Sequence, residues 1–511
     1  MTVSDNNKRI AKNSILLYVR MVLLMVVNLY TSRVVLEVLG VEDYGTYNVV
    51  GGVITTLSFI TGSLGGATSR FLTFEMGKGV TESVEKVFRC SITIYYLFSV
   101  FFLLLAETVG LWFVSSYLVI PEGRNFAALV VYHCSVITFL ISVISIPYNA
   151  LIIAHERMSA FAYISIYEAF SRLLIVFVLP FLSGDSLVWY AILLMFVQVS
   201  VRLIYSVYCK KKFVECVASC LWDKTLFKEM FSYSMWNMNG YLAMVCYTQG
   251  LNILLNIYFG PIVNAARAIS VQVQTALEQF FGNVTMAIKP QVIKQYAQGN
   301  FQYMHSLVLR AGRLSFMMAV LVAVPLFTYT EYILELWLVS PPEHSVAFVR
   351  LMLIAGVSSS LKQHTIMSIH ATGDIKKFQI YEGSFLLLVL PISYFLLKMF
   401  HVSPESVLVC YVLIEIMSEF LRVYLVYPKI NLPIKYFYTN VFFSCMIVTI
   451  FLIIGVYPIY VYCKPHGFYD LVLYTLLIAI YEFFIVYYFG LDKEEKSAVN
   501  KFVIGKLKRL N

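Results

Sequence analysis

The feature that most constrains this chain is a series of apolar runs, each about 20 residues long, that recur along most of its length. A helix of about 20 residues crosses the hydrocarbon core of a bilayer. The runs are continuous rather than alternating, which indicates helices rather than barrel strands. Only 13% of the residues are charged, about half the usual share in soluble domains. These features exclude a soluble enzyme, a disordered protein and a secreted disulfide scaffold.

We therefore predict an all-α polytopic membrane protein with about fourteen transmembrane helices. The predicted spans are 13–36, 44–67, 91–113, 126–149, 159–181, 186–208, 232–258, 261–285, 307–330, 346–369, 379–397, 405–427, 437–460 and 469–490. Losing a pair of spans at one end of the chain would preserve the charge pattern described next, so twelve spans remain an alternative.

The basic residues predict the orientation of these spans. With the N-terminus in the cytoplasm, the cytoplasmic segments hold 25 of the 38 lysines and arginines. The external loops hold only Arg124, Lys398 and Lys464. This asymmetry follows the positive-inside rule and predicts that both termini are cytoplasmic. The net charge of +9 thus reflects topology, and we expect no nucleic-acid partner.

The chain resembles itself at an offset of 220 residues. Gly40 and Gly79 in the first half correspond to Gly260 and Gly299 in the second. We predict two parallel-repeat lobes of six helices each around a central cavity, plus two extra C-terminal helices. The expected division is a cytoplasmic N-terminus (1–12), an N-lobe (13–208), a cytoplasmic linker (209–231), a C-lobe (232–427), spans thirteen and fourteen (428–490) and a basic cytoplasmic tail (491–511).

Four segments resemble the polysaccharide-transport family of O-antigen and capsule flippases, which belongs to the multidrug/oligosaccharidyl-lipid/polysaccharide exporter superfamily. They are Arg33–Gly45, Gly65–Arg70, Trp222–Ser234 and Phe259–Arg267. The resemblance implies a bacterial inner-membrane flippase that moves undecaprenyl-diphosphate-linked oligosaccharide from the cytoplasmic to the periplasmic leaflet by alternating access, for surface polysaccharide biosynthesis. Its implied partners are the lipid-linked oligosaccharide, the bilayer and other polysaccharide assembly proteins.

Polar residues within the spans are the candidate substrate-binding residues, because charge inside a membrane is costly. In span 261–285, Asn264, Arg267, Gln274 and Glu278 share one helical face, which must meet protein or water rather than lipid. We expect this face to line the cavity, with Arg267 on a diphosphate. The alternative is that Arg267 and Glu278 only hold the helices together.

Two further groups complete the candidate set. Arg20 and Asn28 share a face of the first span and are expected to line the cavity, although Arg20 also lies where it can reach lipid headgroups. Lys362 has no evident local partner, and cavity and structural roles are equally open. Arg422 is expected to pair with Glu419, three residues before it in the same helix.

Several functional elements are missing from the sequence. There is no GxxxxGK[ST] phosphate loop, so energy would come from an ion gradient or the membrane potential, or the flip would be passive. Glu278, Glu415 and Glu419 are candidate ion-coupling carboxylates. The nine cysteines form no metal or disulfide pattern, and we expect no cofactor, no metal and no catalytic residue. The competing predictions are a cation-coupled multidrug exporter of the same superfamily and a membrane-embedded polysaccharide polymerase or glycosyltransferase.

Overall fold

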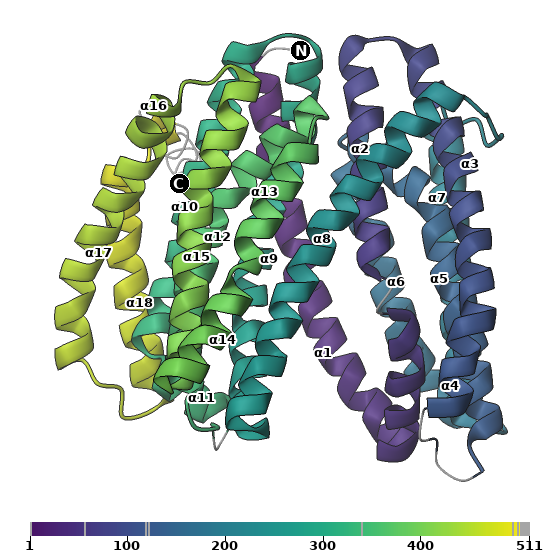
Figure 1. Cartoon of the computed structure of the whole chain (residues 1–511), viewed down its shortest axis with the longest axis horizontal. Helices are drawn as coiled ribbons and strands as arrows, with labels where there is room; N and C mark the ends of the chain where they lie inside the picture. Colours follow the sequence, from purple (N-terminus) through teal and green to yellow (C-terminus); the bar gives the residue numbers. More distant parts are fainter. Residues whose placement is uncertain are drawn as a thin grey trace, which may run out of the picture. The chain divides into compact units, whose positions relative to one another are not determined.

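The computed structural model describes residues 3–55, 58–117, 120, 123–338, 341–492, 495–497 and 500. Over these residues the chain is helical and contains no strand (Figure 1). It divides into two compact units. Unit 1 comprises residues 1–241, 289–299 and 373–376, and unit 2 comprises 242–288, 300–372 and 377–511.

Unit 1 is built around α5, which packs against α2, α3 and α7, while α1 packs against α5 and α6. Apolar side chains from α1, α5, α6 and α7 form one of its cores. Its helical elements are α1 (Val3–Thr55), α2 (Ser58–Lys78), α3 (Thr81–Leu105), η1 (Ala106–Gly110), α4 (Leu111–Tyr117), α5 (Asn125–Ala154), α6 (Met158–Val178), η2 (Leu179–Phe181), α7 (Ser186–Lys212) and the first part of α8 (Lys224–Phe259).

Unit 2 is built around α12, which packs against both α10 and α15. The two last long helices, α17 and α18, pack against each other and against α10. The elements of unit 2, besides the rest of α8, are most of α9 (Pro261–Ala297), α10 (Phe301–Thr328), α11 (Thr330–Leu338), α12 (Ser345–Thr372), α13 (Lys376–Leu387), α14 (Val389–Phe400), α15 (Pro404–Val426), η3 (Tyr427–Ile430), α16 (Ile434–Phe437), η4 (Tyr438–Phe442), α17 (Phe443–Tyr462), α18 (Phe468–Ile485) and η5 (Val486–Gly490).

The all-α prediction is confirmed, and the predicted spans fall on these helices. Among the described residues, ten helices are long and apolar enough to cross a membrane. The four predicted spans outside this set are 13–36 and 44–67, on α1 and α2, and 261–285 and 405–427, on α9 and α15. The last two of these are the polar helices that carry most of the candidate site.

The glycines of the predicted repeat adopt matching backbone conformations. Gly40 has φ 78° and Gly260 has φ 79°, while Gly79 and Gly299 have φ 80° and 72°. This left-handed region favours glycine, because a side chain there meets the backbone. Gly40 breaks the helical geometry within α1, and Gly260 separates α8 from α9. The repeat therefore preserves the positions at which the helices break.

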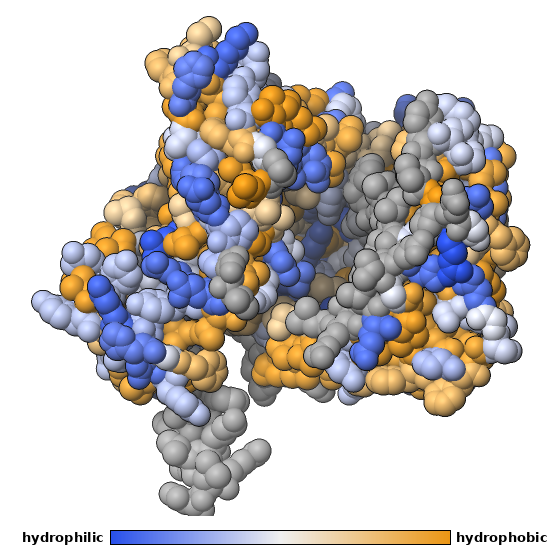
Figure 2. Space-filling view, turned by 90° about the horizontal axis from the view of Figure 1, so that it is seen from below, coloured by the Kyte–Doolittle hydropathy of each residue, from blue (hydrophilic) through white to orange (hydrophobic). Residues whose placement is uncertain are grey.

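The surface of the helices is largely apolar. Phe101, Leu203 and Leu473 are examples of large apolar side chains that are more than half exposed. In unit 2, on the left of Figure 2, hydrophilic residues gather at the end of the helices that faces the viewer. A soluble protein rarely exposes contiguous apolar surface on this scale, whereas a bilayer covers it. The chain is a multi-pass membrane protein.

Candidate functional site

A group of charged and polar side chains, most of them buried, lies on four helices of unit 2, α9, α12, α13 and α15. We refer to them as the polar cluster, which consists of Arg267, Gln274, Glu278, Ser359, Lys362, His364, Glu382, Tyr411, Glu415, Glu419 and Arg422. Four of these are glutamates and three are basic at neutral pH, so the cluster is balanced to within one charge when all are ionised.

Arg422 binds three carboxylates at once. Its side chain is 1% exposed, and its Nε donates to Glu382 Oε1 on α13 at 2.6 Å. Its Nη atoms lie 3.4 Å from Glu415 and from Glu419 on its own helix. The predicted pairing with Glu419 is confirmed as one part of a larger network. Since removing one partner of a buried ion pair is strongly destabilising, Arg422 holds α13 against α15.

The partner that Lys362 lacks in the local sequence is supplied by another helix. Its Nζ lies 3.7 Å from Glu415 Oε1 on α15. One carboxylate thus meets cations from two helices, Lys362 on α12 and Arg422 on α15. Glu415 Oε2 and Glu419 Oε1 are buried and have no hydrogen-bond partner among the described residues, so the network has acceptor capacity left.

Two of the residues predicted on the polar face of α9 contact each other directly. Gln274 Nε2 donates to Glu278 Oε1 at 3.0 Å, and Ser359 Oγ on α12 donates to the same oxygen at 3.0 Å. Asn264, one turn before Arg267, has a buried Oδ1 that accepts no hydrogen bond in the described part of the chain. The predicted face therefore meets protein, and it includes groups whose hydrogen bonds are not satisfied there.

Unlike Arg422, Arg267 has no counter-charge among the described residues. It is 2% exposed. Its Nη1 meets only the Met352 sulfur, at 2.8 Å, which is a weak acceptor, and its Cζ lies 5.7 Å from the centre of the Tyr411 ring. Its Nε is buried without a partner. Among the described residues no carboxylate pairs with it, and Glu278 is not its partner.

Arg20 and Asn28 lie on α1 in unit 1. Arg20 is partly buried, with its Cζ 4.5 Å from the centre of the Phe161 ring on α6, and its Nε is buried without a hydrogen-bond partner. Asn28, two turns further along, is exposed. Asn13, at the start of the same helical face, is buried and donates to the backbone oxygen of Glu156 at 3.3 Å, which gives it a structural role.

Sequence reasoning missed four members of the polar cluster, namely Ser359, Tyr411, Glu382 and His364. Glu382 lies inside the predicted span 379–397, so the rule that flagged Lys362 as an intramembrane charge applied to it as well. His364 is fully buried on α12. Its Nε2 lies 4.0 Å from Glu419 Oε1, and its ring stacks on Phe437. No regular spacing of polar residues in the sequence pointed to His364. No group of three or more potential metal ligands occurs among the described residues.

Comparison with known proteins identifies the family. A family model described as polysaccharide biosynthesis protein matches residues 10–331, more than half of the chain. The chain belongs to the polysaccharide biosynthesis protein family. Among curated proteins, none matches this chain.

Solved structures give the fold of this member of the family. It is similar to an outward-facing multidrug resistance MATE family transporter of the MOP superfamily, with a TM-score of 0.72 and 14% identity over 83% of this chain and 96% of that one. A MATE in the bent conformation gives a TM-score of 0.72 and 15% identity, over 84% and 96% of the two chains. A MOP superfamily transporter from Pyrococcus furiosus gives 0.71 and 14%, over 83% and 96%. The fold is that of these MATE transporters.

Proposed function

We propose that this protein is a flippase that moves undecaprenyl-diphosphate-linked oligosaccharides from the cytoplasmic to the periplasmic leaflet by alternating access. The product would supply surface polysaccharide such as O-antigen or capsule. The family supports a role in polysaccharide biosynthesis, and the MATE fold supports transport. Neither the family nor the fold is that of an enzyme, and we propose transport without covalent chemistry.

The observation that carries this proposal is the isolated positive charge of Arg267. A buried cation without a counter-charge is expensive in a membrane. A guanidinium grips two phosphate oxygens at once, so the diphosphate of a lipid-linked oligosaccharide is a ligand that would compensate this charge. Arg422, which is already bound by three carboxylates, has no such capacity.

Substrate access to Arg267 would require a second conformation, since its side chain is almost fully buried here. Alternating access provides such a change. Arg267 lies in the second turn of α9, directly after the helix break at Gly260. We propose that movement of this end of α9 relative to α12, which carries Met352, exposes the guanidinium. Arg20 on α1 of unit 1 is a second cation without an ion-pair partner among the described residues.

Energy for the flip would come from cations bound by the polar cluster. Glu415 and Glu419 each retain a buried oxygen without a hydrogen-bond partner in the described part of the chain, and Glu278 lies on the same helix as Arg267. Protonation of one of these carboxylates would change the balance of charge around Lys362 and Arg422. In this proposal the protein lies in the bacterial inner membrane with both termini in the cytoplasm, as the loop charges indicate.

A cation-coupled multidrug exporter is the second candidate. The four glutamates of the polar cluster, three of them buried, and the MATE structures favour it, because an exporter of cationic drugs needs acidic groups. The isolated charge of Arg267 opposes it, since a buried arginine repels a cationic drug.

Deletion of the gene distinguishes the two functions. The flippase predicts that one surface glycan is lost, that lipid-linked repeat units accumulate on the cytoplasmic face, and that drug sensitivity is unchanged. An unchanged surface glycan together with raised sensitivity to cationic drugs would instead support the exporter. Complementation with the intact gene is the control for effects on neighbouring genes.

A further inference from the structure

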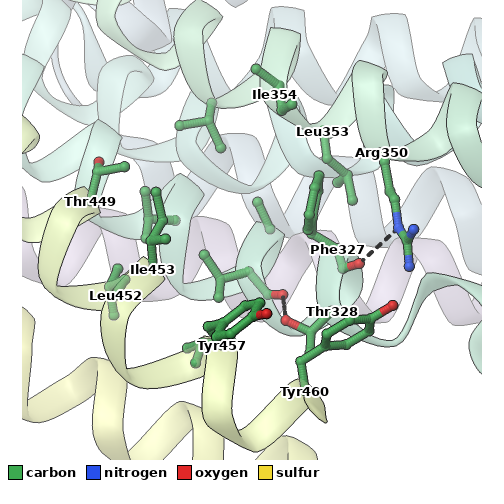
Figure 3. Close-up of a pocket in the computed structure, with 15 residues that line it drawn as sticks. Phe327, Thr328, Arg350, Leu353, Ile354, Thr449, Leu452, Ile453, Tyr457 and Tyr460 are labelled. Atoms are coloured by element: carbon green, nitrogen blue, oxygen red, sulfur yellow. Dashed lines mark hydrogen bonds between the residues drawn. The ribbon is translucent and has the colours of Figure 1, made fainter. Parts of the chain in front are cut away.

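A cavity lies between α10, α12 and α17 of unit 2, outside the polar cluster. Its volume is about 450 Å³. Its walls are almost wholly apolar and include Val320, Val324, Leu353, Ile453 and Val456. Figure 3 shows the side chains of these three helices facing the space between them. We call this cavity the slot.

One end of the slot adjoins a second, more polar pocket of about 270 Å³, which we call the mouth. Thr328, Arg350 and Tyr460 line both spaces, so the two adjoin. The mouth adds Lys464, from the segment between α17 and α18, and Glu331. A long apolar space with charged groups at one end matches the shape and polarity of a lipid.

The basic groups of the mouth are free to bind an anion. Arg350 Nε donates to the Phe327 backbone oxygen at 3.3 Å (Figure 3), which fixes the side chain at the mouth. Over the described residues, the Nη atoms of Arg350 and the Nζ of Lys464 form no hydrogen bond or ion pair with protein. With Glu331 also ionised, the mouth has a net charge of one positive unit, which matches one phosphodiester.

The length of the slot matches one leaflet. Along α10 the slot extends from Val320 to Thr328, about 12 Å at 1.5 Å per residue. Along α17 it extends from Thr449 to Tyr460, about 16 Å on the same basis. Half of a bilayer core is about 15 Å. An acyl chain of a leaflet lipid fits this depth, whereas an undecaprenyl chain is longer.

We propose that the slot binds one acyl chain of an anionic glycerophospholipid, and that Arg350 and Lys464 hold its phosphate. In the predicted orientation this lipid belongs to the periplasmic leaflet. The lipid fills the space between α17 and the pair α10 and α12, so it fastens the last two helices to the rest of unit 2. This site is separate from the flipped substrate and does not depend on the proposed function.

The test is lipid binding by the purified full-length protein in detergent, followed by native mass spectrometry and by thermal melting. The probes are phosphatidylglycerol, phosphatidylcholine and undecaprenyl phosphate. The double variant Arg350→Ala with Lys464→Ala removes the phosphate contacts, and Val324→Phe fills the slot. Ile453→Trp, at an exposed position on the slot wall, is the second filling variant in case Val324→Phe does not fold. Lys398→Ala is the control, since Lys398 is an exposed basic residue of α14 that lines neither space.

Phosphatidylglycerol should bind the unaltered protein and raise its melting temperature. The double variant should weaken this binding by about tenfold or more, because charge-assisted hydrogen bonds are lost, and a filling variant should weaken it as well. Lys398→Ala should bind normally. Equal binding of phosphatidylglycerol by all variants would overturn the proposal. Phosphatidylcholine binding as tightly as phosphatidylglycerol, filling variants without effect, or retention of undecaprenyl phosphate alone would each contradict the assigned lipid.

Discussion

Replacing Arg422 by alanine should destabilise unit 2 more than any other single loss of charge in the polar cluster. Three carboxylates face this one guanidinium, at 2.6, 3.4 and 3.4 Å. Lys362 and His364 are the nearest remaining basic groups, at 3.7 Å from Glu415 and 4.0 Å from Glu419, and neither is paired with Glu382. Breaking a buried pair costs about 3–5 kcal/mol, a large share of the roughly 5–15 kcal/mol by which proteins are stable.

The assay is thermal melting in detergent, with membrane abundance as a second measurement. Arg422→Ala should melt well below the unaltered protein. Arg422→Lys should be intermediate, because lysine keeps the charge but lacks the planar guanidinium that binds carboxylates on both helices. Arg172→Ala is the matched control. Arg172 pairs with Glu168 one turn away on α6 and is half exposed, so its loss should cost only about 0.5 kcal/mol or less. If Arg422→Ala and Arg172→Ala melt alike, the network does not stabilise the fold as described.

Two further predictions concern the termini of the spans. With native cysteines removed, a membrane-impermeant maleimide applied to spheroplasts should label Ser116→Cys but not Thr225→Cys, and the reverse result would invert the predicted orientation. The contact of Asp492 with Arg313 on α10 should open at low pH, as a reversible rise in backbone hydrogen exchange at Asp492, corrected for the intrinsic exchange rate, between about pH 5 and pH 2. Burial raises the pKa of Asp492, but hydrogen bonds from the Glu495 backbone and from Arg313 outweigh it and hold this pKa below its usual value. The stability that Asp492 contributes is therefore complete above the ordinary aspartate pKa of about 3.9 and is lost as the pH falls through the lowered pKa. Asp492→Asn should already exchange rapidly at this position at about pH 5, and a variant as well protected as the unaltered protein would rule out this contact.

The elements that depend on local sequence were predictable. Hydropathy located the helices, because a membrane span must bury its backbone polar groups within one apolar segment. The spacing of glycines at Gly40 and Gly260 located corresponding breaks, because both adopt a backbone conformation that favours glycine. The pairing of Arg422 with Glu419 followed from helical geometry alone, since residues three apart are neighbours on one face.

The contacts between helices were not predictable. Glu382 meets Arg422 across 40 residues of sequence, and no helical period relates them. The sequence does not reveal the partner of Lys362, because Glu415 lies on another helix. The sequence could predict that α9 has a polar face, but only the packing of α12 decides that Arg267 meets the sulfur of Met352 rather than a carboxylate. Periodicity shows which face of a helix is polar and does not show what lies opposite.

The most direct test of the proposed function is export by variants of Arg267. Surface glycan is measured per molecule of protein in the membrane for the unaltered protein, Arg267→Lys and Arg267→Ala, together with the melting temperature of each. Loss of a charge-assisted hydrogen bond costs about 1.5–3 kcal/mol, and each 1.4 kcal/mol is about tenfold in affinity. Arg267→Ala should therefore reduce export at limiting substrate by about ten- to a hundredfold, and Arg267→Lys should be intermediate. Neither variant should have a lower melting temperature than the unaltered protein. Equal export per molecule in all three would contradict the binding of substrate by Arg267.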